Sequence, residues 1–249
     1  MVRIENPAID PDRLAQVATL AAGAHPDGSA MCAMEAIAFI AGEPVTDHPA
    51  CTAPVIAAFI RTWSDGLPQT ERDALIRPFL PRLVGTGGSE ALERRRVARV
   101  ADWLVRTHVP AWFHLAKLIV EGDELADLPA LQDVGDLASL CDHLKRARKR
   151  AAVANLTLRQ TGSEVRNAAW DAAHRAAWVT VRHALEAAGP RVLAAGWDAA
   201  HAAAYAAARA YGKAPLEPTR RALQDTAREL VEDLIAMQDP VSSGNESMP

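Results

Sequence analysis

The amino-acid sequence predicts an all-α protein of about nine helices. Apolar residues recur at intervals of three and four in most segments, which is the spacing of one face of an amphipathic helix. No segment shows the alternation of apolar and polar residues that a half-buried strand requires, and no glycine-rich phosphate loop follows an apolar run. Alanine supplies much of the hydrophobic content of 49%, so we expect closely packed helices with short side chains.

Length, charge and cysteine content limit the function classes. The 249 residues carry a net charge of −4, so the chain is not expected to coat nucleic acid through bulk positive charge. Three cysteines are an odd number and favour reduced thiols over a disulfide framework. The chain opens without a signal-peptide pattern, and no apolar run approaches the ~20 residues of a membrane span. These features predict a soluble, cytoplasmic protein without membrane contact.

Start and stop residues predict the first two helices. Asp10 or Asp12 can cap a first helix that ends at Ala22. Residues 30–41 form the second, with Ser29 as its N-cap. The glycine and proline that follow supply a sharp stop.

The next predicted helix begins at Pro54 and ends near Ser64. Its inner face is expected to consist of Ile56, Phe59, Ile60 and Trp63. Thr70 and Asp73 then resemble a capping box at the start of a further helix, which two prolines divide into short pieces.

Two long helices are predicted later in the chain. Ser89 begins one that runs to about His108, before Pro110 begins the next. The polar side of the first is expected to carry Glu90, Glu93, Arg94, Arg95 and Arg96. The last helix runs from Thr219 to Met237 and has the cleanest amphipathic pattern in the chain. Its apolar residues are Leu223, Ala227, Leu230, Leu234 and Met237.

The segment MCAMEAIAFIAGEPVTDHPAC, residues 31–51, combines a helix, a sharp stop and reactive side chains. Two thiols, a carboxylate and an imidazole are a sufficient ligand set for zinc or iron, and we expect them to converge in one pocket because the connection between the two helices is short. These residues are Cys32, Glu35, His48 and Cys51.

Other interpretations of this cluster stay open. Its spacing lacks the paired Cys-x-x-Cys arms of a zinc ribbon or finger. Cysteine is often buried, Asp47 and His48 suit a turn, and Glu35 can cap the helix or pair with an arginine. A site for a ligand other than a metal is the third alternative.

The sharpest charge reversal lies in the middle of the chain. Residues 118–144 contain seven acidic residues and no lysine or arginine, and five cations follow within six positions. These cations are Lys145, Arg146, Arg148, Lys149 and Arg150. They predict either a solvated helix that pairs with the acidic segment or a contact site for phosphate or nucleic acid.

An internal repeat occupies the alanine-rich part of the chain. Two copies of an aromatic–histidine–aromatic stripe, spaced by four residues, are separated by Gly189 and Pro190, which predicts an antiparallel helical hairpin. The stripe residues are Trp170, His174, Trp178, Trp197, His201 and Tyr205. They either fill the core or form a slot that stacks a flat ligand.

Three phrases of the sequence carry a resemblance: MCAMEAIAFIAGEPVTDHPACTAPVIAAF, ADWLVRTHVPAW and LEPTRRALQDTARELVEDLIAM. They resemble segments that recur in a family of uncharacterised alanine-rich helical proteins from GC-rich bacteria and their phages. The resemblance implies an all-helical cytoplasmic protein and assigns no catalytic residue.

These patterns predict four segments. They are an N-terminal globule (1–120), an acidic-to-basic connection (121–160), an alanine-rich bundle (161–238) and a disordered tail (239–249), and the two halves could equally share one core. The favoured function is a helical binding protein with a protein or small-molecule partner. The alternatives are a metal-dependent enzyme that uses the cysteine cluster, and a protein that contacts a ligand or nucleic acid through the basic run or the aromatic stripe.

Overall fold

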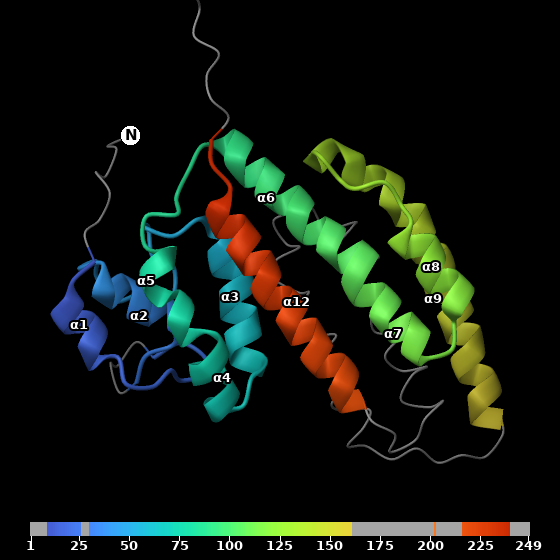
Figure 1. Ribbon diagram of the computed structural model, residues 1–249, viewed down its shortest axis with the longest axis horizontal. Coiled ribbons are helices and arrows are strands. Elements are labelled where there is room, and N and C mark those ends of the chain that lie inside the picture. The colour runs from blue at the N-terminus through green and yellow to red at the C-terminus, as the bar shows by residue number, and fades with distance from the viewer. Residues whose placement is uncertain (1–8, 26–29, 161–201, 203–215, 240–249) are drawn as a thin grey trace, which may run out of the picture.

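The computed structural model describes residues 9–25, 30–160, 202 and 216–239, and this part of the chain is all-α (Figure 1). No strand occurs within these ranges, so the predicted fold class is confirmed. The predicted count of about nine helices includes the alanine-rich hairpin. That hairpin lies outside the described residues, apart from Ala202, and stays a prediction.

The described helices keep the order of the chain. They are α1 (Pro11–Gln16), α2 (Ala33–Ile40), α3 (Pro54–Gly66), α4 (Gln69–Leu75), α5 (Leu80–Leu83), α6 (Glu90–Trp103), α7 (Val109–Leu115), α8 (Ile119–Ala126), α9 (Leu137–Gln160) and α12 (Leu216–Ala236). Two 3₁₀ turns, η1 (Arg77–Phe79) and η3 (Val134–Asp136), and one π-helical turn, η2 (Leu104–His108), connect some of them.

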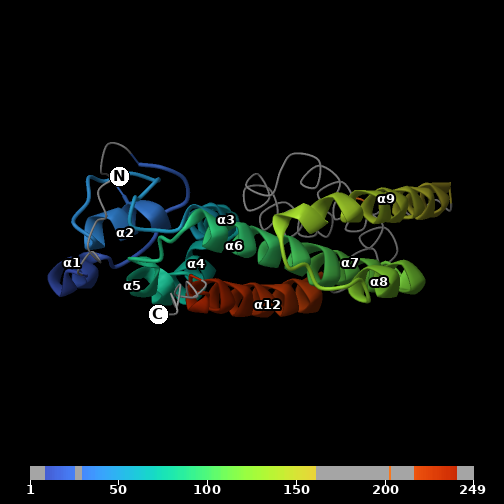
Figure 2. The same cartoon turned by 90° about the horizontal axis from the view of Figure 1, so that it is seen from above.

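The rod formed by α6, η2 and α7 is the axis of the fold (Figures 1 and 2). Helix α12 packs against α3, α6 and α7, while α1 and α2 lie near one end of the molecule and α8 and α9 near the other. One cluster of buried apolar residues extends from Val17 to Leu234. The C-terminal helix therefore shares a core with the N-terminal segments, and the predicted segment boundaries stay predictions.

Helices α1 and α2 are shorter than expected. Asp10 caps α1 as predicted, but the helix ends at Gln16 and not at Ala22. The backbone N–H of Leu20 instead donates to Asp73 Oδ1 at 2.8 Å, so long-range hydrogen bonds replace a further helical turn. Helix α2 begins at Ala33 with Cys32 as its N-cap.

Helix α3 confirms its prediction, because all four expected inner residues are buried. The capping box expected at Thr70 is wrong, since Pro68 stands at the N-cap without a side-chain bond and Asp73 binds Leu20 instead. The prolines that follow divide the chain into η1 and α5, as expected from the helical hydrogen bonds that proline cannot make.

The rod begins at Ser89, whose Oγ accepts the N–H of Leu92 at 3.2 Å. The expected break before Pro110 is replaced by the π-helical turn, in which the N–H of Val109 donates to the carbonyl of Leu104. A proline in a helix clashes with the carbonyl four residues earlier, and one extra residue in the turn relieves such a clash. The rod therefore continues into α7.

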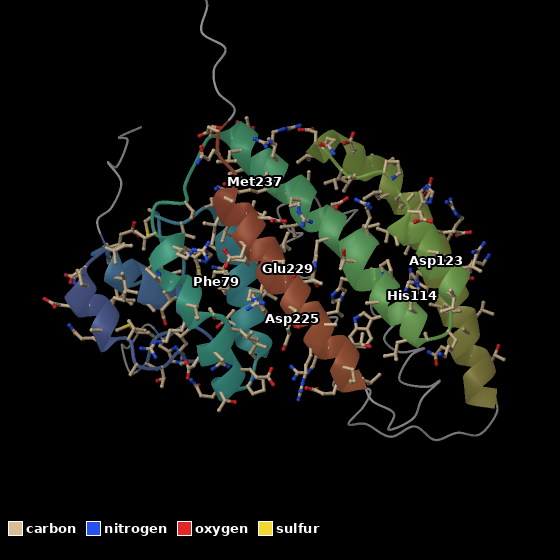
Figure 3. The ribbon with its side chains drawn as sticks, viewed as in Figure 1. Phe79, His114, Asp123, Asp225, Glu229 and Met237 are labelled. Atoms are coloured by element: carbon tan, nitrogen blue, oxygen red, sulfur yellow. The ribbon has the colours of Figure 1, made fainter. Side chains whose placement is uncertain are left out.

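Helix α8 folds back closely on α7 (Figure 3). His114 Nε2 lies 3.0 Å from Asp123 Oδ1, which joins the two helices. A Cβ atom at Gly122 would lie only 2.5 Å from the His114 ring, so glycine is needed at this approach. The resulting α7–α8 pair sets the position from which the chain continues to α9.

Arg96 is not on the polar side of its helix, as the sequence suggested, but is 2% exposed. Its guanidinium donates to the carbonyls of Leu234 at 3.1 Å and Thr86 at 2.8 Å, and to Glu93 Oε1 at 2.6 Å. The last carbonyls of a helix have no partner within it, so the side chain supplies one for the end of α12. This correction identifies the contact that fixes α12.

Helix α12 has the predicted apolar face, and Leu223, Ala227, Leu230 and Leu234 are all buried. It begins at Leu216, three residues before the predicted start, because the proline that follows is tolerated in a first turn. Ion pairs tie its outer side to the N-terminal half, with Arg220 at 2.8 Å from Glu71 and Asp233 at 2.7 Å from Arg99.

We expect Arg96→Met to lower the free energy of unfolding by about 3–5 kcal/mol, because the substitution leaves a buried carboxylate and buried carbonyls without their donor. Equilibrium unfolding in urea measures this loss. Arg95→Met is the matched control: Arg95 is exposed and donates only to the carbonyl of Gln238, so its loss should cost less than about 1 kcal/mol. Equal losses in the two variants would contradict the role given to Arg96.

Candidate functional site

Two of the predicted metal ligands, Cys32 and Glu35, form the N-terminal cap of α2. Cys32 Sγ accepts the N–H of Glu35 at 3.5 Å, and Glu35 Oε2 accepts the N–H of Cys32 at 2.7 Å. Glu35 Oε1 also accepts the N–H of His25 at 2.5 Å. Both side chains are therefore engaged by the backbone, and the capping alternative for Glu35 is confirmed.

Burial sets the protonation of this cap. It raises the pKa of the Cys32 thiol to about 11, so the group is a neutral thiol at pH 7. Burial also acts to raise the pKa of Glu35, but the hydrogen bonds from the Cys32 and His25 N–H groups outweigh it and lower that pKa. The pair is thus a charged carboxylate beside a protonated sulfur, and the nucleophilic and metal-binding form of cysteine is the thiolate.

The other two predicted ligands lie in different environments. The His48 side chain is 72% exposed and contacts the Asp47 carboxylate and the Arg61 guanidinium. Cys51 is buried, which raises the pKa of its thiol to about 11. Within the described ranges, no group of three or more histidine, cysteine or acidic residues is placed to hold a metal ion.

The predicted convergence of Cys32, Glu35, His48 and Cys51 is therefore wrong. It required residues 42–50 to run back along α2. Instead, Arg61 donates to the carbonyl of Asp47 at 2.7 Å, which ties the connection to α3. These four residues do not form the expected zinc or iron site.

The five cations of residues 145–150 are all exposed on α9, around a buried side that contains Leu144, Ala147 and Ala151. Arg150 pairs with Glu121 at 3.5 Å and Glu124 at 3.3 Å, both on α8. These pairs link the basic run to the acidic segment before it.

The remaining cations differ in their contacts. Lys145 lies 3.5 Å from Asp142, and Arg148 also has an electrostatic or hydrogen-bonding partner. Arg146 contacts the ring nitrogen Nδ1 of His143 at 2.8 Å, and neither Arg146 nor Lys149 has a carboxylate partner among the described residues. These two cations are the ones free to meet an external anion.

A groove of about 560 Å³ lies between α8 and α9, and we call it the basic groove. It is lined by Leu118, Glu121, Arg146, Lys149, Arg150, Val153 and Ala154. Cations therefore lie beside apolar side chains, and Val153 is 56% exposed. The sequence indicated the cations, but the apolar wall depends on the pairing of α8 with α9, which no local pattern predicts.

His108 is a buried titratable residue that the sequence analysis did not identify as a site. It is fully buried between Trp103 and Trp112, with ring centroids 5.2 and 6.5 Å away. Neither ring nitrogen has a hydrogen-bond partner, and burial lowers its pKa to about 3. Its position in the π-helical turn was the missing information, because a regular helix would place the ring differently.

The aromatic stripe lies outside the described residues. This applies to all six of its members, Trp170, His174, Trp178, Trp197, His201 and Tyr205. Both interpretations of the stripe stay predictions.

Comparisons with known protein families, curated proteins and solved structures find no match. The resemblance to alanine-rich bacterial and phage proteins therefore stays a prediction. Within the described residues, no helix combines the length and apolar composition needed to cross a bilayer.

We expect His108 to make the protein less stable in acid. Its pKa in the folded state, about 3, lies below the ordinary value of 6.5, so between these values the unfolded state binds more protons and stability falls as the pH is lowered. From pH 7.5 to 5 this linkage amounts to about 2 kcal/mol. Urea unfolding at both pH values measures it.

The variant His108→Leu should lose this share of the pH dependence, and because neither nitrogen is hydrogen-bonded it should keep its stability at pH 7.5. The exposed residue provides the control His48→Gln, which should behave as the wild type. An unchanged pH slope in His108→Leu would refute the assignment.

The three thiols should differ in reactivity. Cys141 is partly exposed and lacks the raised pKa of the two buried thiols, so it should react first with iodoacetamide at pH 7.5. Mass spectrometry after timed labelling locates the modified residue. The control is Cys141→Ser, in which fast labelling should vanish, and rapid modification of Cys32 in the folded protein would contradict the cap geometry.

Proposed function

We propose that this chain is a cytoplasmic binding protein whose basic groove holds an acidic, partly apolar helical segment of a partner protein. The observation that carries the proposal is the side-by-side placement of two cations without carboxylate partners, Arg146 and Lys149, and apolar Leu118 and Val153. An amphipathic helix binds a groove through an apolar face, and acidic residues at its edge complement the cations.

The distribution of charge favours this partner over nucleic acid. A nucleic-acid backbone is bound by rows of cations that neutralise successive phosphates. In the groove, Arg150 is already paired with Glu121 and Glu124. The chain as a whole carries a net charge of −4, which repels a polyanion at long range.

The apolar wall supports the same choice. Val153 and Leu156 are one helical turn apart on α9 and are 56% and 57% exposed, and Ile119 and Val120 follow the groove residue Leu118 and are 46% and 64% exposed. Exposed apolar side chains that rim a binding surface gain free energy when a partner covers them. A phosphate backbone offers no such cover.

Fluorescence anisotropy tests the proposal with a labelled helical peptide of about 20 residues that carries leucines on one face and glutamates on the other. We expect salt-dependent binding that Arg146→Gln with Lys149→Gln weakens by about tenfold and makes less sensitive to salt. Val153→Glu should weaken it as well, because it places a carboxylate on the apolar wall.

The matched control removes two exposed cations elsewhere, by Arg77→Gln with Arg228→Gln, and should leave peptide affinity within about twofold of the wild type. A labelled 20-nucleotide single-stranded DNA is the competing probe. Groove-dependent binding of DNA that is tighter than binding of the peptide, or peptide binding that ignores the groove substitutions, would overturn the proposal.

A further inference from the structure

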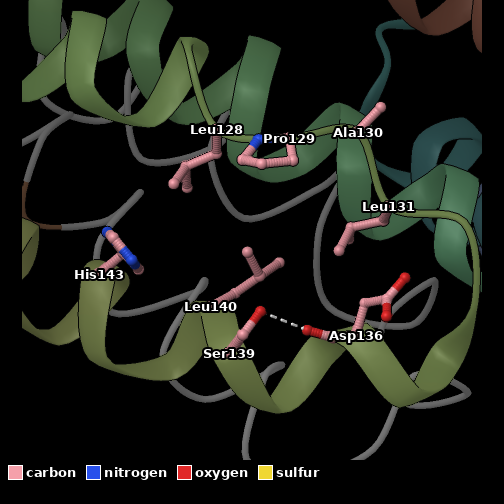
Figure 4. A pocket seen from close by; sticks show the side chains of 8 residues that line it. All are labelled: Leu128, Pro129, Ala130, Leu131, Asp136, Ser139, Leu140 and His143. Atoms are coloured by element: carbon pink, nitrogen blue, oxygen red, sulfur yellow. Dashed lines mark hydrogen bonds between the residues drawn. The ribbon is translucent and has the colours of Figure 1, made fainter.

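A cavity of about 350 Å³ lies between the segment after α8 and the first turns of α9, and we call it the α9 pocket (Figure 4). It is lined by Leu128, Pro129, Ala130, Leu131, Asp136, Ser139, Leu140 and His143. Figure 4 shows Leu128 and Leu131 pointing toward Leu140 across the opening. The middle of the pocket is therefore apolar, and its volume lies in the range of small-molecule sites.

The two ends of the pocket have different chemistry. Figure 4 places His143 at one end and Asp136 at the other, with Ser139 between them. Ser139 Oγ donates to the carbonyl of Asp136 at 2.7 Å. Asp136 Oδ2 already accepts the N–H groups of Gln132 and Asp133, both at 3.1 Å, so this carboxylate caps η3.

The His143 end is a donor site. Arg146 lies 2.8 Å from Nδ1 of His143, and because a guanidinium only donates, Nδ1 is the acceptor and the neutral ring carries its proton on Nε2. Nε2 has no partner among the described residues. The pocket thus presents an N–H donor backed by a permanent positive charge.

We propose that the α9 pocket binds a small organic carboxylate. Its apolar body lies among Leu128, Leu131 and Leu140, and its carboxylate accepts the Nε2 proton of His143 beside the Arg146 guanidinium. The reverse orientation would place the carboxylate next to Asp136 and is disfavoured by repulsion between like charges. This site stands independently of the proposed function, which concerns the basic groove.

The test uses hexanoate as the probe, with hexylamine as its cationic analogue. Saturation-transfer NMR on the full chain should show binding of hexanoate with a Kd on the order of 1 mM and no binding of hexylamine. In the protein labelled with ¹⁵N-histidine, hexanoate should shift the Nε2 resonance of His143. The exposed ring of His48 should give an unchanged signal.

Two variants locate the site. Ser139→Phe puts a bulky ring into the pocket from an exposed position and should abolish hexanoate binding. His143→Leu removes the donor and should weaken it at least about tenfold, while the control His48→Leu leaves it unchanged. Circular dichroism confirms that each variant is folded.

Several outcomes would overturn the inference. They are equal binding of hexylamine, hexanoate binding that survives Ser139→Phe, and the absence of a His143 shift at about 10 mM hexanoate. The groove peptide should bind Ser139→Phe as it binds the wild type, so failure of the pocket and failure of the groove are distinguishable.

Discussion

The hydrogen bonds of the buried Arg96 guanidinium hold the last helix of the described chain in the core. They join α6 to the final carbonyls of α12 and to the carbonyl of Thr86. Arg72 does the same for α3, because it donates to the carbonyls of Ser64 at 2.8 Å and Leu67 at 2.6 Å. Each cation lies at the negative end of a helix, where its charge is most favourable. With α3 and α12 fixed against the rod, α7 and α8 follow, and these position α9.

The sequence predicted those parts of the fold that depend on neighbours in the chain. The start at Ser89, the inner face of α3 and the apolar face of α12 all follow from local caps and spacing, and all are confirmed. The errors occur where a distant residue decides. Arg96 resembles its charged neighbours until the end of α12 reaches it, and α1 ends early because Asp73 accepts a backbone N–H that a longer helix would use.

The candidate sites follow the same division. A cysteine and a glutamate three residues apart at a helix start have the spacing of a capping box, so the local pattern already contained the structural role of Cys32 and Glu35. The types of side chain suggested metal chemistry, but types alone do not determine where His48 and Cys51 lie. The exposure of the basic run followed from its charge. The basic groove and the α9 pocket did not, because both are formed by segments whose pairing is tertiary.

Arg146 connects the two proposed sites. Its guanidinium lines the basic groove and also lies 2.8 Å from the His143 ring that lines the α9 pocket. A carboxylate bound at His143 would attract this guanidinium and leave Lys149 as the one groove cation without a carboxylate partner among the described residues. Coupling between two binding sites is reciprocal, so an acidic segment that holds Arg146 in the groove would weaken binding in the pocket by the same factor. One flexible side chain on a rigid helix is sufficient for such coupling, because it can form only one of the two contacts at a time.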